Sequence, residues 1–135
     1  MTKIWGFTGT RHGMTERQKI ELAKLLQGAQ ALHHGDCVGS DQEAHNLAKA
    51  LGIWTVGHPP EDSKLRAHCD VDELRDPLPY LERDENIVKE TDALIATPHT
   101  MQEMIRSGTW TTIRYAIQHD KWATIIYPNG DIEVR

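Results

Sequence analysis

Short apolar runs alternate along this chain with stretches in which apolar residues recur at helical spacing. A short apolar run bounded by turn residues is typical of a buried strand, and recurrence every three to four residues is typical of a helix. The predicted strands are 3–8, 29–34, 53–57, 93–97 and 123–127, and the predicted helices begin near residues 15, 40, 80 and 109. This alternation predicts one α/β domain over 1–135, with a doubly wound, mostly parallel sheet of about five strands and helices on both faces.

Two of the predicted helix starts carry the sequence of a capping box, in which the side chains of two residues cap each other's backbone N–H groups. Thr15 pairs with Gln18 in the first helix, and Ser40 pairs with Glu43 in the second. Both pairs precede an apolar face, so we expect each to begin its helix.

Two further segments depart from the alternating pattern. Acidic residues and prolines gather in 61–79, which predicts a partly helical surface excursion that acts as a lid or functional loop. Asn129-Gly130 is typical of a type I′ hairpin turn, so 131–134 is predicted to return as an edge strand.

Composition narrows the functional classes. With 39% hydrophobic residues and no apolar run near the roughly 20 residues of a membrane span, the chain is expected to be cytoplasmic and not bound to a membrane. Two cysteines are too few for a disulfide framework. Fifteen Lys and Arg against twenty Asp and Glu give a net charge of -5, which disfavours a nucleic-acid surface. Any bound anion must be held locally, by backbone amides and a few cations.

Three loops that follow predicted strands contain glycine and precede helices. Glycine lets a backbone approach a ligand closely, and free amides at a helix start can hold a phosphate, although glycine also simply turns a chain. In a doubly wound sheet these loops meet at the carboxyl ends of the strands. The candidate ligand-binding residues in them are Thr8, Gly9, Thr10, Arg11, Gly35, Asp36, Gly39, Ser40, Arg106, Ser107, Gly108 and Thr109.

The run RDENIVKETDALIATP at 83–98, followed by Ser107-Gly108-Thr109, resembles the central motif of the Lonely Guy phosphoribohydrolases. Together with Thr8-Gly9-Thr10-Arg11 and the loop at 34–41, it is similar to the wider SLOG superfamily of Rossmann-like nucleotide-binding proteins, which includes the DNA-processing A proteins and small phage and bacterial domains. The resemblance covers about residues 3–127.

The resemblance implies a Rossmann-like fold and a pocket for a nucleotide or a nucleotide-derived molecule. It places the Gly108 and Thr109 amides at a phosphate with Arg83 nearby. Asn86, Thr97 and Pro98 of the same run, and Trp110 after it, complete the candidate ligand-binding set.

One departure bears on catalysis. In the phosphoribohydrolases the arginine works with a glutamate two or three residues after Gly-Thr, and this chain has Thr111 and Thr112 there. A threonine cannot stabilise an oxocarbenium-like centre or activate a water as a carboxylate does. Glu103 and Asp41 are the carboxylates that could take its place, so the candidate catalytic residues are Arg83, Glu103 and Asp41. Both carboxylates also have a non-catalytic explanation, because an acidic residue such as Asp41 is favoured at a helix start and Glu103 fits a solvated loop.

Eight histidines and two cysteines invite a metal site, but their spacing matches no compact zinc pattern, and no metal or cofactor is predicted. His34 and His58 stand at strand ends, where each fits a ligand contact or a turn. Trp5 and Trp54 lie in predicted strands and are expected in the core, because aromatic residues dominate cores.

Three functional hypotheses remain open. The first is a nucleotide-binding protein that hydrolyses or transfers at the N-glycosidic bond. The second is a sensor or sequestering module for a nucleotide signal, without catalysis. The third, which the net charge opposes, binds single-stranded DNA. A homodimer or higher homo-oligomer is also predicted.

Overall fold

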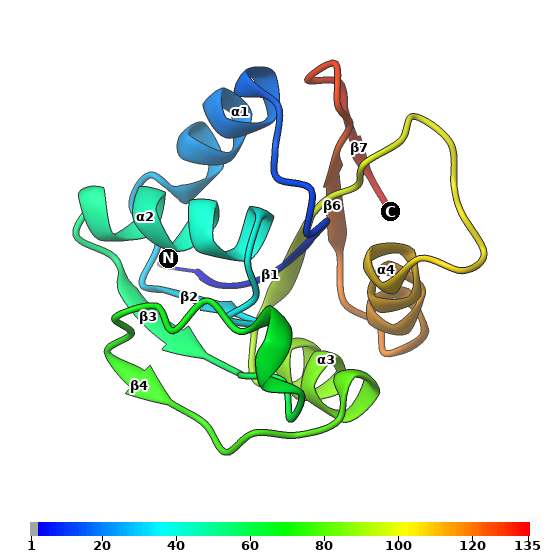
Figure 1. The fold of residues 1–135 in the computed structure, drawn as a ribbon. Coiled ribbons are helices and arrows are strands. Elements are labelled where there is room, and N and C mark those ends of the chain that lie inside the picture. Colours follow the sequence, from blue (N-terminus) through cyan, green and yellow to red (C-terminus); the bar gives the residue numbers. More distant parts are fainter. Residues whose placement is uncertain (1–2) are drawn as a thin grey trace.

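A seven-stranded sheet runs through the centre of the computed structural model, which describes residues 3–135 (Figure 1). In chain order the elements are β1 (Ile4–Gly9), α1 (Glu16–Leu26), β2 (Ala31–His34), α2 (Ser40–Ala50), β3 (Trp54–Gly57), the 3-10 helix η1 (Ser63–Leu65), β4 (Glu73–Leu74), α3 (Tyr80–Lys89), β5 (Ala93–Thr97), α4 (Gly108–Gln118), β6 (Ala123–Ile126) and β7 (Ile132–Val134). The strand order is β4-β3-β2-β1-β5-β6-β7, and only the β6–β7 pair is antiparallel. The predicted mostly parallel α/β sheet is confirmed.

Each face of the sheet is covered by its own pair of helices (Figure 1). On one face α1 and α2 pack over a cluster that includes Phe7, Leu32 and Ile95. On the other face α3 and α4 pack over a cluster that includes Leu94 and Ile125. Successive side chains of a strand point to opposite faces of the sheet, so the residues of β5 contribute alternately to the two clusters.

The strand order reverses direction at the β1–β5 pair, because β2 and β3 extend from one side of β1 whereas β5 and β6 extend from the other. Gly9 and Thr97 are register partners at the carboxyl ends of these two strands. The connections that follow the two strands run in opposite directions along the sheet at such a point, and this leaves a crevice between the loops beyond the carboxyl ends of the strands.

The two predicted capping boxes differ in outcome. The Thr15–Gln18 box is present, with both reciprocal hydrogen bonds, and it begins α1. The Ser40–Glu43 box is wrong, because Gly39 is the N-cap of α2 and no side chain caps that helix. Ser40 is already inside the helix, and its side chain and that of Glu43 contact the loop after β1.

The C-terminal hairpin is present, but its turn is not type I′. That turn needs positive φ at both central residues. Among the described residues of this turn only Gly130 has positive φ, at 92°. The Gly130 N–H donates to the Tyr127 carbonyl at 2.8 Å, so Pro128 and Asn129 form the centre of the turn and Gly130 follows it.

Two expectations near the other edge of the sheet need correction. Trp5 is buried as expected, but Trp54 is 49% exposed and donates its indole N–H to Glu73 at 2.7 Å. The excursion at 61–79, which was expected to be partly helical, contains the short helix η1 and also the short strand β4, which the sequence did not predict. Trp54 is the first residue of β3 and the exposed one, whereas the three residues after it are buried.

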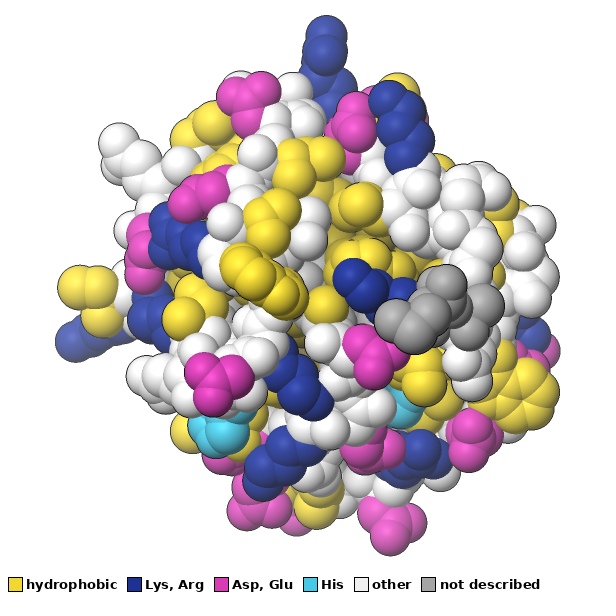
Figure 2. Space-filling model, turned by 180° about the vertical axis from the view of Figure 1, so that it is seen from behind, with side chains coloured by type: hydrophobic (Ala, Val, Ile, Leu, Met, Phe, Trp, Pro, Cys, Tyr) yellow, Lys and Arg dark blue, Asp and Glu magenta, His cyan; other side chains and the backbone are white. Residues whose placement is uncertain are grey.

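No helix within 3–135 is long and apolar enough to cross a membrane. On the face seen from behind, lysine and arginine side chains are scattered among acidic and hydrophobic ones (Figure 2). This face therefore presents charges of both signs side by side.

Candidate functional site

A cavity of about 630 Å³ lies beyond the carboxyl ends of β1, β2 and β5. Its volume falls in the range of small-molecule sites. The candidate residues that line it are Thr8, Gly9, Thr10, Arg11, Gly35, Asp41, Arg83, Arg106, Ser107, Gly108, Thr109 and Trp110. The structure therefore brings together at one cavity residues from all three glycine-containing loops.

The loop after β1 is held by α2. The Ser40 amide and hydroxyl both donate to the Thr10 carbonyl, at 3.0 and 2.6 Å, and Glu43 accepts the Met14 N–H at 2.6 Å. A side chain on Gly39, whose φ is 90°, would overlap the backbone of Arg11. Gly39 and Ser40 thus lie outside the cavity lining and position the loop that lines it.

The first turn of α4 forms one end of the cavity. The Ser107 hydroxyl accepts the Trp110 N–H at 3.3 Å, and the Ser107 carbonyl accepts the Thr111 N–H at 2.8 Å. The N–H groups of Gly108 and Thr109 have no hydrogen-bond partner within the described part of the chain. Two free amides at the positive end of a helix favour an anion.

Arg83 forms the floor at the other end. It is 5% exposed, and its Nη1 donates to the carbonyls of Gly35 and of His58, the latter at 3.2 Å. Its Nε lies 2.8 Å from Asp84 Oδ1. The Cys37 Sγ lies 3.6 Å from Nη1 and 3.7 Å from Nη2. α3 thus supplies a guanidinium that is fixed against the ends of β2 and β3.

Two carboxyl groups line the cavity next to Arg83. Burial raises the pKa of Asp41 to about 7, although the Arg83 charge opposes the shift. Burial also raises the pKa of Asp84. Oδ2 of Asp41 accepts the Cys37 N–H at 3.2 Å. Near neutral pH Asp41 therefore exchanges between its protonated and ionised forms, which suits either hydrogen bonding or proton transfer.

Glu103 lies away from this cavity. Its carboxylate is 2.8 Å from Arg114 and 2.9 Å from Arg135, and these partners lower its pKa. The loop at 98–107 carries Glu103 outward toward the C-terminus, so of the three candidate catalytic residues only Arg83 and Asp41 line the cavity.

Asp36 is also absent from the lining. Its side chain is 1% exposed, accepts the Arg66 Nε–H at 3.1 Å and accepts the Cys69 N–H at 2.8 Å. These contacts fasten the excursion at 61–79 to the loop after β2. Leu65 of the excursion lines the cavity, so Asp36 acts on the site by positioning that segment.

The remaining candidates from the family-like run support the cavity from below or beside it. Thr97 is fully buried, and its hydroxyl has no hydrogen-bond partner among the described residues. The Pro98 carbonyl accepts from the Gln18 side chain at 2.9 Å. Asn86 is half-buried on α3. None of these three lines the cavity.

Several lining residues were missed by the sequence reasoning. His12 and His99 lie on the loops after β1 and β5, with ring centroids 4.6 Å apart. Cys37 lies on the loop after β2. The signal was available, because each follows a predicted strand by a few residues. Tyr80 and Leu81, which begin α3, gave no such signal, since their place depends on how α3 packs.

Four histidines are buried beside the site in two hydrogen-bonded pairs. His33 Nδ1 and His58 Nε2 are 2.9 Å apart, and His34 Nε2 and His45 Nδ1 are 3.1 Å apart. Burial lowers the pKa of His34 to about 3 and that of His58 to about 4. These imidazoles are therefore neutral at physiological pH.

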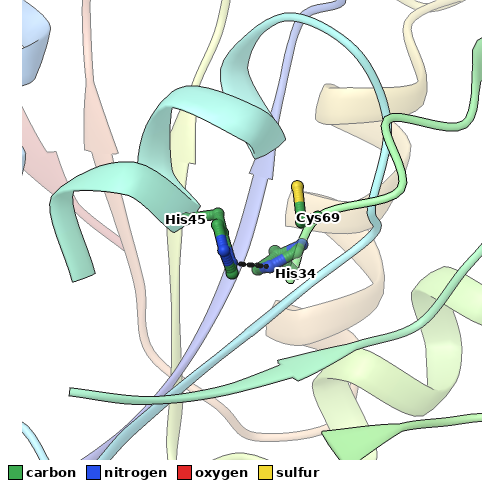
Figure 3. Close-up of side chains that lie close together, drawn as sticks. All are labelled: His34, His45 and Cys69. Atoms are coloured by element: carbon green, nitrogen blue, oxygen red, sulfur yellow. Dashed lines mark hydrogen bonds between the residues drawn. The ribbon is translucent and has the colours of Figure 1, made fainter. Parts of the chain in front are cut away.

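His34, His45 and Cys69 come together from β2, α2 and the excursion, and could be taken for a metal site (Figure 3). The His34 Nδ1 accepts the Asp36 N–H at 3.0 Å, so the His34 proton must be on Nε2, where it points at His45. Burial and a hydrogen bond to Asp36 raise the pKa of the Cys69 thiol to about 12. The proton positions thus favour a closed hydrogen-bond network over metal ligation.

The fold has close counterparts among solved structures. The chain superposes on the molybdenum cofactor binding protein from the phototrophic bacterium Rippkaea orientalis with a TM-score of 0.72 and 22% identity, covering 94% of this chain and 77% of that one. For the molybdenum cofactor carrier protein from Chlamydomonas reinhardtii the TM-score is 0.69 at 22% identity, with 93% and 76% covered. The chain also superposes on DNA processing protein A from Streptococcus pneumoniae with a TM-score of 0.67 and 18% identity. That match covers 92% of this chain and 50% of the other.

The chain shares the Rossmann-like α/β fold of these solved structures. The likeness to these structures confirms the fold that the resemblance implied. No family model and no curated protein sequence matches the chain. In this fold the cavity occupies the crevice where the strand order reverses between β1 and β5, which is where ligands of doubly wound sheets bind.

Proposed function

We propose that this protein binds a small phosphate-bearing molecule of nucleotide-like form in the cavity beyond β1, β2 and β5. The observation that carries the proposal is the pair of unpartnered amides of Gly108 and Thr109 at the start of α4. Arg11 and Arg106 line the same cavity and are exposed, so their guanidinium groups are available to an anion.

The similar structures support a small-molecule ligand. Two of them are named for the molybdenum cofactor that they bind or carry. A carrier needs a cavity that holds its ligand without altering it, and Thr111 lines this cavity at a place where the phosphoribohydrolase pattern has a glutamate. Binding for sensing, sequestration or carriage is therefore the function that we favour.

Isothermal titration tests this proposal with inorganic phosphate, ribose 5-phosphate, nucleoside monophosphates, ADP-ribose and the molybdenum cofactor. Arg106→Ala should weaken the affinity for phosphate compounds by about tenfold, because it removes a charge-assisted hydrogen bond. Arg17→Ala is the matched control, since Arg17 is exposed and outside the cavity lining. Millimolar or weaker affinity for every compound, unchanged in Arg106→Ala, would show that the proposal is wrong.

A second candidate function is hydrolysis or transfer at the N-glycosidic bond. It is favoured by Asp41, a carboxyl that lines the cavity and whose pKa burial raises to about 7, where a general acid or base works best. Incubation with ribonucleoside monophosphates should then release free base, and Asp41→Asn should abolish the release. Binding without base release leaves the non-catalytic function.

We also propose self-association through the exposed edge strand β7. Ile132 and Val134 are 44% and 57% exposed there, and an open strand edge pairs readily with another copy. Sedimentation velocity should show a dimer or larger species that Val134→Lys converts to monomer. Adding a single-stranded oligonucleotide to the same experiment should give no complex, in keeping with the net charge of -5.

A further inference from the structure

The two ends of the cavity offer different chemistry. Gly108 and Thr109 provide free amides at the start of α4, which follows β5. Asp41, in the first turn of α2, and Arg83, on α3, lie beside the loop after β2, and β1 stands between β2 and β5. Neighbouring strands are about 4.8 Å apart, so the two ends are separated by roughly 10 Å. A ligand that contacts both must be elongated, with an anionic group at one end only.

The floor has unused hydrogen-bonding capacity. Nη1 of Arg83 is occupied by two carbonyls and Nε lies against Asp84. Among the described residues, Nη2 meets only the Cys37 sulfur, at 3.7 Å. Oδ2 of Asp41 accepts the Cys37 N–H, and no described residue donates to Oδ1. A guanidinium donor and a carboxylate acceptor are thus both open to a ligand, and burial makes leaving them unpaired costly.

The open donor of Arg83 and the open acceptor of Asp41 favour a ligand with a particular arrangement of hydrogen-bonding groups. An ionised Asp41 repels a phosphate, so the anionic group of the ligand belongs at α4. A carboxylate is best matched by two adjacent N–H groups. Because Nη1 and Nε of Arg83 are already engaged, its remaining Nη2 donor suits a single acceptor such as a carbonyl oxygen. A carbonyl, a ring N–H and an exocyclic amine stand in a row on the 2-amino-4-oxopyrimidine ring of guanine and of pterins. Adenine lacks the ring N–H and the carbonyl.

We propose that the cavity floor recognises the 2-amino-4-oxopyrimidine edge of a guanine-type or pterin-type ring, with Asp41 as the specificity-determining residue. Arg83 then donates to the ring carbonyl. This inference rests on the proposed function, because it requires the phosphate to bind at α4. Gly35 is part of the arrangement, since a Cβ there would overlap Arg83 and lie 2.7 Å from Asp41 Oδ2.

The protonation of Asp41 gives the proposal a second readout. Burial raises its pKa to about 7, Arg83 opposes the shift, and the nearby carboxylates of Asp84 and Asp36 add to it; Cys37 donates its backbone N–H. Two ligand N–H groups favour the ionised carboxylate, so binding near neutral pH should release protons. Titrations in buffers of different ionisation enthalpy measure that release.

The test compares GMP, IMP, AMP and XMP on the wild-type protein and on Asp41→Asn by isothermal titration. GMP should bind at least about tenfold more tightly than AMP, and IMP, which lacks the amine, should fall between them. Asp41→Asn should lose the preference for GMP and gain one for XMP, because an amide can donate to the second carbonyl of xanthine. Asp120→Asn is the matched control, since Asp120 is exposed and outside the cavity lining.

Guanine and pterins share the 2-amino-4-oxopyrimidine edge, and neopterin monophosphate tests which of the two ring systems the site prefers. Tighter binding than GMP assigns the site to a pterin, and weaker binding assigns it to guanine; either supports the proposal provided that AMP binds more weakly than both. The gain in affinity for XMP also keeps the test independent of folding, because a misfolded variant gains nothing.

Two outcomes would overturn the inference while the proposed function stands. The first is equal affinity for GMP and AMP, with ribose 5-phosphate competing against both. The second is base release that Asp41→Asn abolishes without any change in the relative affinities, which would place Asp41 at the sugar. Failure of every phosphate compound to bind would instead overturn the proposed function.

Discussion

The buried Asp36 forms an ion pair with the half-buried Arg66 between the loop after β2 and the excursion at 61–79, with Arg66 Nε donating to Asp36 Oδ2 at 3.1 Å. The backbone of the two segments joins the contact, because the Ala67 N–H donates to the Asp36 carbonyl at 2.8 Å. The φ of Asp36 is 53°, a conformation that Asp and Asn tolerate better than most residues. The excursion is therefore fastened at its middle as well as at its ends.

Asp36→Ala should loosen this segment. The change leaves the Cys69 N–H without its acceptor and Arg66 without its partner, and so should lower the free energy of unfolding by about 2–3 kcal/mol. Hydrogen exchange in 61–79 should accelerate more than elsewhere. Glu61→Ala, which removes an exposed carboxylate from the same segment, should change neither quantity. Uniformly faster exchange over the whole chain would contradict a local role for Asp36.

Gly35→Ala should damage the cavity floor. The added Cβ would overlap Arg83 Nη1 and crowd Asp41, and φ at this position is not in the left-handed region, so the penalty comes from contact and not from backbone strain. We expect a loss of about 1–3 kcal/mol in the free energy of unfolding. Gly108→Ala is the stability control, because its Cβ enters open space in the first turn of a helix. Equal urea midpoints for both variants would refute this account of the floor.

Acid should destabilise the fold through its histidines. The pKa of His34 is lowered to about 3 and that of His58 to about 4, so between pH 6.5 and pH 4 the unfolded chain binds protons that the folded chain does not. Asp41 acts in the opposite sense, because its pKa is raised to about 7 and the folded chain gains its proton first. Burial also lowers the pKa of His33 and His45 and raises that of Asp84, so the histidines outnumber the opposing carboxyl groups. Each unopposed histidine lowers the free energy of unfolding by at most about 1.4 kcal/mol per pH unit.

Urea unfolding at three pH values across this window measures the slope. Asp41→Asn should make it steeper, because it removes one of the opposing carboxyl groups. A free energy of unfolding that rises as the pH falls would contradict the buried neutral state of His34 and His58.

Glu103→Gln should leave ligand binding unchanged. The carboxylate pairs with Arg114 and Arg135 outside the cavity, in a place where water screens the charges. Titration with the tightest ligand of the panel checks this expectation, and a small change in melting temperature reports the lost ion pairs. If Glu103→Gln releases less base or binds the ligand more weakly than the wild-type protein, then Glu103 takes part in the function.

The order of strands and helices was predictable because it depends on local patterns. Alternating apolar runs and the capping box at Thr15 report the packing of neighbouring residues, and the structure has both. The prediction of the second capping box failed because its two side chains bind residues that are distant in the sequence. Ser40 and Glu43 match a capping box in sequence, yet they bind the loop after β1, about 30 residues earlier.

The site shows the same division. The three glycine-containing loops were predictable as its borders, because the carboxyl ends of parallel strands meet at one edge. The roles within them were not, because they depend on residues distant in the sequence: Arg66 binds the Asp36 carboxylate, and the Arg83 charge acts on Asp41. Tyr80 reaches the cavity only through the packing of α3.

The contact between Arg83 and the Gly35 carbonyl spans 48 residues and joins α3 to the opposite half of the sheet. The floor of the cavity therefore forms only when α3 and the loop after β2 have come together. A ligand that contacts Arg83 therefore binds only the chain in which both halves have docked. Its binding should raise the apparent melting temperature with ligand concentration, and so reports on complete folding.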